Sequence, residues 1–199
     1  MIDKVRRVIT GEAEGHGVFT HIEEVLPLML GGTRWYGVWG WDEPPSFPYH
    51  STEPYVPRSA FPSPEGHGLR INVVEFPAGA GVAEGDNGVA LDLSSAEAWK
   101  RLVEAQPHGH ILDTKTGMHS TDSVDIGFVL SGELCVEQDD GEVVLRPGDV
   151  YVQNGATHAW RNRSSEPCLV AFLLMSFGGR TTPRGLPDGA TLAELSGGG

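Results

Sequence analysis

Two histidines and one aspartate are the residues of this chain whose types could do chemistry together. His119 and Asp125 belong to one stretch, MHSTDSVDIG, and His158 lies far along the chain. Two imidazoles and a carboxylate form the facial ligand set that iron(II) uses most, and manganese, nickel or zinc would also bind there. An imidazole also titrates near neutral pH and can act as a general base without a metal. These three residues are the predicted catalytic residues and the predicted ligands of one divalent metal.

The spacing of these residues constrains the elements that must hold them. Positions 119 and 121 share a face if they lie on a strand, because alternate side chains point to the same side. Asp125 shares that face if no bulge intervenes, and His158 must be brought across by closure of a barrel. Asp125 could instead orient a histidine, and Asp122 could supply the carboxylate in its place. The alternative for both histidines is an ordinary hydrogen-bonded role.

Strand signals dominate the chain, with turn residues every eight to ten positions in the C-terminal half. Short strands at this spacing predict an all-β barrel or sandwich. One inserted helix is also expected, because Ser94 and Glu97 form a capping box and apolar residues then recur at helical spacing to about Gln106. The expected strands are residues 4–10, 17–26, 33–41, 69–77, 123–132, 133–138, 142–146, 150–153, 158–163 and 168–175.

Aromatic residues mark a second region of interest. In TRWYGVWGW (33–41), alternation places Trp35, Trp39 and Trp41 on one face, which could be core, interface or the wall of a pocket. The following segment, 42–68, is rich in proline and aromatic residues, so no regular ladder can run through it. A loop of this length is either a lid or binding loop, or a surface strap stiffened by proline. The predicted substrate-pocket residues are Thr121, Trp35, Trp39 and Trp160.

The C-terminal half resembles the cupin superfamily over about residues 115–176. The first cupin motif, His-x-His followed by Glu and Gly, is matched by HST at 119–121, Asp125 and Gly132. The second motif is matched by PGD at 147–149, QNGATH at 153–158 and Asn162. The resemblance implies a cupin-type double-stranded β-helix, a jelly-roll barrel, and a homodimer, since cupins often pair through N-terminal strands.

Three positions depart from the cupin pattern. The second histidine of the family is Thr121 here, its glutamate is Asp125, and Gln153 stands where proline is usual. A threonine hydroxyl is a poor ligand for a borderline metal, so the four-ligand cupin site cannot form from these positions. A three-ligand site remains, completed if needed by His108 or His110.

Three functions are compatible with this pattern. The first is a metal-dependent enzyme of decarboxylase, isomerase or dioxygenase type acting on a small, aromatic or carboxylate-bearing molecule. The second is a metal-free lyase, dehydratase or isomerase in which a histidine is the general base. The third is a binding module without catalysis. The expected organisation is one cupin domain over residues 1–176, with an N-terminal strand extension, and a partly flexible tail over 177–199.

The composition limits the partners. The formal net charge of −13 disfavours nucleic acid and anionic membranes as partners. It says little about a small-molecule ligand, which is the expected partner of the pocket. No apolar run reaches the length of a membrane helix, and the N-terminus does not resemble a signal peptide. Cys135 and Cys168 each lie in an apolar, strand-like run and are expected to be reduced thiols. The expected location is the cytoplasm.

Overall fold

The structure, a computed structural model, describes residues 2–30, 32–47, 60–63, 66–81, 109–113 and 116–178. Regular structure within these ranges consists of strands, which confirms the predicted all-β class. No helix in this part of the chain is long and apolar enough to cross a membrane. The strands are β1 (Val5–Ala13), β2 (His16–Val25), β3 (Leu28–Leu30), β4 (Thr33–Trp41), β5 (Leu69–Phe76), β6 (Gly109–Asp113), β7 (Met118–Thr121), β8 (Val124–Ser131), β9 (Leu134–Gln138), β10 (Gly141–Leu145), β11 (Val150–Asn154), β12 (Ala159–Arg161) and β13 (Cys168–Met175).

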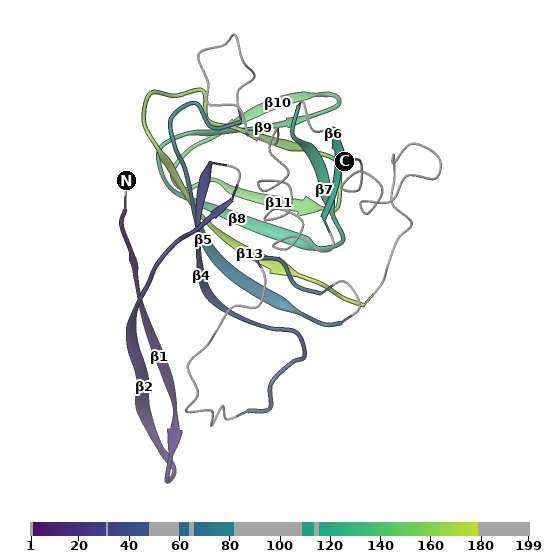
Figure 1. Cartoon of the computed structure of the whole chain (residues 1–199). Coiled ribbons are helices and arrows are strands. Elements are labelled where there is room, and N and C mark those ends of the chain that lie inside the picture. Colours follow the sequence, from purple (N-terminus) through teal and green to yellow (C-terminus); the bar gives the residue numbers. More distant parts are fainter. Residues whose placement is uncertain are drawn as a thin grey trace, which may run out of the picture.

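The barrel is built from two main antiparallel sheets. One has six strands in the order β11-β8-β13-β5-β4-β3, and the other has three in the order β10-β9-β12. The pair β6-β7 continues the smaller sheet through a bridge between His119 and His158. Figure 1 shows the resulting jelly-roll arrangement, with β9 and β10 lying across the barrel from β5 and β13. The predicted jelly-roll barrel is confirmed.

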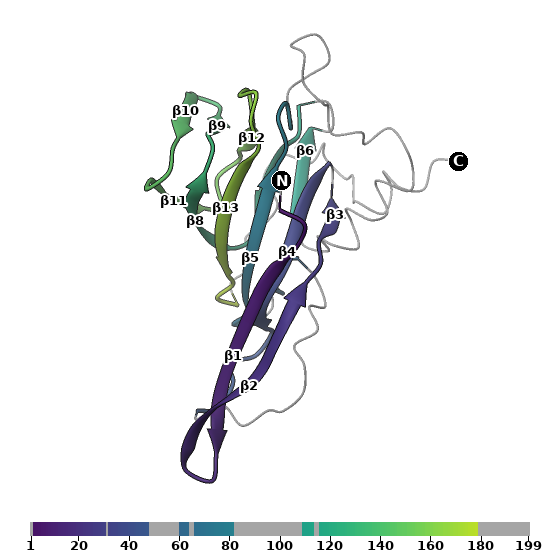
Figure 2. The same ribbon diagram turned by 90° about the vertical axis from the view of Figure 1, so that its left-hand side faces the viewer.

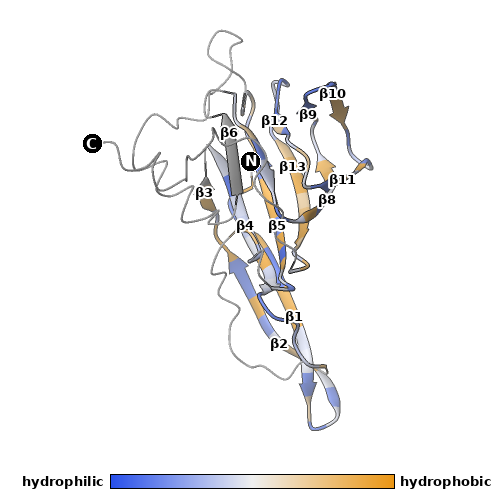
Figure 3. Ribbon diagram, turned by 90° about the vertical axis from the view of Figure 1, so that its right-hand side faces the viewer, coloured by the Kyte–Doolittle hydropathy of each residue, from blue (hydrophilic) through white to orange (hydrophobic). Residues whose placement is uncertain are grey.

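The core is formed by every second side chain along the strands. In β13, Cys168, Val170, Phe172 and Leu174 are buried, and the residues between them are half-buried. This is the period-two pattern of a strand with one face against a core. Figure 3 shows hydrophobic colouring along the barrel strands, with β13 prominent, whereas the β1–β2 hairpin is mostly pale or hydrophilic.

The β1–β2 hairpin extends away from the barrel, as Figures 1 and 2 show. Its root is attached to the barrel by polar contacts. Arg7 donates to the backbone oxygens of Gly37 and Val38 at 3.3 and 2.9 Å and forms an ion pair of 2.7 Å with Glu23. Tyr36, fully buried in β4, donates from its hydroxyl to Ile2 O at 2.5 Å. The predicted N-terminal strand extension is therefore an arm that packs against the outside of β4.

A bulge in β4 divides the aromatic residues that alternation placed on one face. Trp35 pairs with Val74 and packs against the core, with its ring 5.4 Å from that of Phe61. The register shifts between Gly37 and Trp39, so Trp39 pairs with Ile71 and points to the other side of the sheet. The expectation that Trp35 and Trp39 share a face is therefore wrong.

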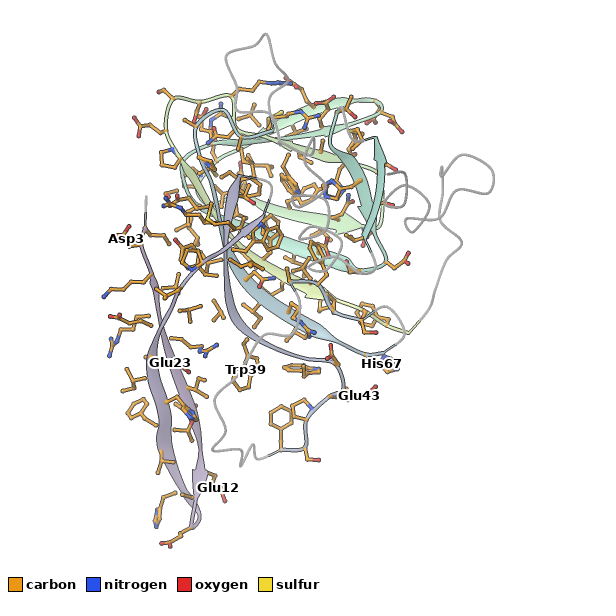
Figure 4. All side chains as sticks on the ribbon, in the orientation of Figure 1. Asp3, Glu12, Glu23, Trp39, Glu43 and His67 are labelled. Atoms are coloured by element: carbon orange, nitrogen blue, oxygen red, sulfur yellow. The ribbon has the colours of Figure 1, made fainter. Side chains whose placement is uncertain are left out.

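Trp39 lies instead in a hollow outside the barrel. Figure 4 shows it between β4 and the β1–β2 hairpin. The hollow has a volume of about 310 Å³, and neither His119 nor His158 lines it. Its lining residues are Arg7, Val8, Ile9, Thr10, Val38, Trp39, Trp41, Pro45 and Phe47.

Several sequence predictions lie outside the described residues. These are the helix expected from Ser94 to Gln106, the central part of the proline-rich segment 42–68, and the tail from residue 179 onward. The two cysteines fall within the described part. Cys135 and Cys168 are both buried and free, as expected.

Candidate functional site

His119 and His158 meet where β7 lies beside the start of β12. Each donates its backbone N–H to the backbone oxygen of the other, at 2.9 Å in both directions. Their rings have centroids 4.4 Å apart and are tilted by 48°. Barrel closure therefore brings together the two histidines that the sequence separates, as predicted.

Both imidazoles are held in the same way. His119 Nδ1 lies 2.9 Å from Gly117 O, and His158 Nδ1 lies 3.0 Å from Ala156 O. A carbonyl oxygen can only accept, so the His119 ring carries its proton on Nδ1 and has its lone pair on Nε2. His158 Nδ1 contacts both a carbonyl oxygen and the amide nitrogen of Gln153; the carbonyl favours a proton on Nδ1 and the amide donor favours a proton on Nε2. The tautomer with its proton on Nδ1 is one that metal-binding histidines use, with Nδ1 bonded to a backbone carbonyl.

The surroundings keep both rings neutral. Burial lowers the pKa of His119, and the charge of Arg161 lowers it further. Burial, together with the adjacent His119, lowers the pKa of His158 to about 3. Both rings are therefore neutral at neutral pH, and the nitrogen that carries no proton in each ring can bind a metal ion or accept a proton.

Two buried polar side chains brace the loops that carry these histidines. Gln153 Nε2 donates to Ala156 O at 2.6 Å and contacts His158 Nδ1, and its Oε1 accepts from Asn154 N at 3.1 Å. Arg161 Nη2 donates to Thr116 O at 2.5 Å, next to the residue whose carbonyl holds His119. Gln153, which stands where proline is usual in cupins, thus supplies a hydrogen-bonding amide to the site.

Asp125 is fixed by hydroxyl groups. Thr121 Oγ1 donates to Asp125 Oδ2 at 3.1 Å, and Ser123 Oγ donates to Oδ1 at 2.6 Å. Burial raises the pKa of this carboxyl to about 6, against the lowering effect of the two hydroxyls. The threonine that replaces the second histidine therefore binds the carboxylate.

The carboxylate and the histidines do not form one ligand set. No group of three or more His, Cys, Asp or Glu side chains within the described ranges is placed to hold a metal ion. The described residues do not include His108, and of His110 only the backbone is described, which pairs with Ser120. The described part of the site offers two imidazole ligands and a carboxyl group bound to hydroxyls.

Strand pairing nevertheless places Asp125 near the histidines. Asp125 in β8 pairs with Gln153 in β11, and directly opposed residues have neighbouring side chains. Gln153 contacts His158, and Tyr151 lies two residues earlier on the same face of β11. Burial raises the pKa of Tyr151, and the charge of Asp125 raises it further.

Aromatic rings surround this group. Trp160, predicted as a pocket residue, lies edge-on to His158 at 5.5 Å and to Tyr151 at 5.0 Å between centroids. The rings of Phe172 and Phe76 also lie beside Trp160, at 5.4 and 6.1 Å between centroids. The histidines therefore border an aromatic interior, in which charged groups are poorly solvated.

Tyr151, Gln153 and Ser123 were not among the predicted site residues. The stretch VYVQ (150–153) held a usable signal, because its polar and apolar residues alternate. That alternation places Tyr151 and Gln153 on the face opposite Val150 and Val152, which are more than half exposed. The link between Ser123 and Asp125 depends on the local turn, which alternation does not describe.

Known proteins resemble this chain over its C-terminal part. Residues 102–176 match the family model for the cupin domain. Over 65 residues the chain is 48% identical to phomopsin biosynthesis cluster protein C' of Diaporthe leptostromiformis, covering 32% of each chain. Over 63 residues it is 41% identical to the cupin-domain-containing oxidoreductase srdB of Neurospora crassa, covering 31% of this chain and 32% of the other. The matched region thus spans about a third of the length of these relatives.

Among solved structures, a Cupin 2 conserved barrel domain protein from Salinispora arenicola is 12% identical, with a TM-score of 0.38. The alignment covers 74% of this chain and 79% of that one. Both motifs quoted from the sequence fall within the residues that match the family. Residues 102–176 of this chain are a cupin domain.

Proposed function

We propose that this chain is a cupin enzyme that acts on a small organic molecule, with one divalent metal ion bound by Nε2 of His119 and Nε2 of His158. The observation that carries the proposal is the pair of buried imidazoles, each with Nδ1 within hydrogen-bond distance of a backbone carbonyl and with ring centroids 4.4 Å apart. Two such donors side by side suit iron(II), manganese, nickel or zinc.

Of the described side chains, His119 and His158 are the two that fit a metal ion as ligands. Asp125 is bonded to Thr121 and Ser123 and is not grouped with the histidines, so the remaining ligand positions fall to substrate oxygen atoms, water or groups outside the described residues. When bound, the ion would act as a Lewis acid toward a substrate oxygen. A decarboxylation, an isomerisation or a dioxygenation of an aromatic or carboxylate-bearing molecule is compatible with this arrangement.

The protein's own groups have distinct roles in this proposal. The two histidines would hold the ion beside the reacting molecule, and Trp160, whose ring lies 5.5 Å from that of His158, would exclude water there. Asp125, whose pKa is raised to about 6, exchanges a proton near neutral pH. The names of two relatives, an oxidoreductase and a biosynthesis cluster protein, support small-molecule chemistry for this chain as well.

Metal analysis of the purified protein tests the proposal. We expect about one divalent ion per chain in the wild type, loss of the ion in His119→Ala and in His158→Ala, and retention in Asp125→Asn. Asp125→Asn is the matched control, because it changes a buried polar group in the same interior without removing an imidazole. A wild-type protein that binds no divalent ion after reconstitution would contradict metal binding.

The second candidate is metal-free acid–base chemistry, favoured by Thr121 in place of the second histidine. His158 Nε2 would then be the base, since the ring is neutral at neutral pH. Turnover that persists in chelator-treated, metal-free protein and is lost in His158→Ala would support this candidate. Homodimerisation stays a prediction, and light scattering on the full chain tests it.

A further inference from the structure

Tyr151 carries an unusual polar group in the barrel interior. Its hydroxyl oxygen is the one buried side-chain polar atom in the described part of the chain without a hydrogen-bond partner. Gln138 is near enough to lower the pKa of this hydroxyl, but the two side chains do not meet hydrogen-bond geometry. Buried polar groups are almost always paired, so an unpaired one in a protein interior calls for a functional explanation.

The ring that carries this hydroxyl has a defined position. It packs edge-on against Trp160 at 5.0 Å and lies 6.5 Å from the His158 ring, measured between centroids. Its strand neighbour on the same face, Gln153, contacts His158 directly. The Tyr151 side chain therefore points into the same interior as the histidine pair.

The hydroxyl remains protonated at physiological pH. Burial raises the pKa of Tyr151 to about 12, and the nearby Asp125 carboxyl adds to the effect. A protonated phenol beside an acidic side chain serves best as a hydrogen-bond donor, and its natural partner is an oxygen atom with a free lone pair.

We propose that Tyr151 is a ligand-binding residue, whose hydroxyl donates a hydrogen bond to a carboxylate or carbonyl oxygen of an aromatic acid held beside His119 and His158. The aromatic part of the ligand is inferred from the surrounding rings of Trp160 and Phe172, which favour a planar apolar body. This inference rests on the proposed function, because it assigns the ligand class of the same site.

The first test measures whether the hydroxyl is unpaired, and it needs no ligand. Tyr151→Phe is compared with Tyr36→Phe, whose hydroxyl is also buried but donates to Ile2 O. We expect the Tm of Tyr151→Phe to equal or exceed that of the wild type, and the Tm of Tyr36→Phe to fall by about 3 °C. A comparable fall in both variants would overturn the assignment, because it would show that Tyr151 already has a partner.

The second test measures binding of benzoate, as the aromatic acid, and toluene, which has the same ring without the oxygen atoms. Titration followed by NMR uses the protein as purified, after its metal content has been determined. We expect Tyr151→Phe to weaken benzoate binding about fivefold to tenfold and to leave toluene binding unchanged. Equal benzoate binding by both proteins, or no binding by the wild type, would overturn the proposal.

The metal content separates a failure of this inference from a failure of the proposed function. A wild type that holds metal through the two histidines but binds benzoate without help from Tyr151 would refute the inference alone. If the wild type holds no metal but Tyr151→Phe binds benzoate more weakly than the wild type, the proposed metal binding is refuted and the role of Tyr151 is supported. The two results are therefore independent.

Discussion

His119 and His158 are joined through their backbones, with each donating an N–H bond of 2.9 Å to the carbonyl oxygen of the other. The distance between the two imidazoles is therefore set by main-chain pairing between β7 and the start of β12. The rings themselves are ordered by the contacts of Nδ1 with Gly117 O and Ala156 O, so little side-chain entropy is lost when a ligand binds. The side chains around the pair then decide which nitrogen carries the proton.

Gln153 is expected to determine the tautomer of His158. In Gln153→Leu the amide that bonds Ala156 O and contacts His158 Nδ1 is lost, so Nδ1 keeps only the Ala156 carbonyl, which is then free to turn away. We expect a mixture of tautomers at His158 in NMR spectra of the imidazole nitrogens, and a loss of metal affinity of about 10- to 100-fold.

His119 is the internal control for this variant. Its Nδ1 is held by Gly117 O, which Gln153 does not contact, so its tautomer should stay as in the wild type. A His158 signal unchanged in Gln153→Leu would show that the carbonyl alone fixes the ring.

The buried Asp125 carboxyl should make folding stability depend on pH. Its pKa is about 6 in the folded protein, against 3.8 for an exposed aspartate, so folding favours the protonated form. The unfolded chain binds fewer protons between these values, and stability contributed by the neutral carboxyl is lost as pH rises from about 4 to about 6.

Asp125→Asn removes this dependence, because the amide does not titrate. We expect the variant to gain stability over the wild type as pH rises through this window, by on the order of 2 to 3 kcal/mol in total. Urea unfolding at pH 4, 5, 6 and 7 measures the difference. A difference between the two proteins that stays constant with pH would contradict the burial of a charged carboxylate.

Thr121 is expected to hold Asp125 and not a metal ion. Thr121→Val keeps the shape of the side chain and removes the hydroxyl that donates to Oδ2. Since that hydroxyl lowers the pKa of Asp125, the pKa should rise further in the variant, as NMR titration of the carboxyl carbon would show. We expect a loss of stability of about 1 kcal/mol and an unchanged metal content. Loss of metal in Thr121→Val would instead identify Thr121 as part of the ligand set.

The sequence supported the strands, the barrel and the histidine pair, because period-two alternation and motif spacing are local signals. The site of Trp39 was not predictable in this way. One bulge between Gly37 and Trp39 moves the side chain of every later residue in β4 to the other face of the sheet. The sequence signal for this bulge is a glycine, which alone does not predict one. The hydrogen bonds from Ser123 and Thr121 to Asp125 were not predictable from the sequence either, since they depend on a turn that brings both hydroxyls to one carboxylate.

Gly132, the glycine of the first cupin motif, is expected to be required by both space and backbone conformation. It has φ of +75°, and a Cβ atom there would lie 2.5 Å from Pro167 O, which belongs to the backbone before β13. Gly132→Ala must therefore shift either the turn after β8 or the start of β13, and we expect a loss of at least about 2 kcal/mol in urea unfolding. Gly17→Ala is the matched control, because a Cβ atom at Gly17 meets nothing within 4 Å. If the two variants have similar free energies of unfolding, the β8–β9 turn can accommodate a Cβ atom at position 132, and this prediction is wrong.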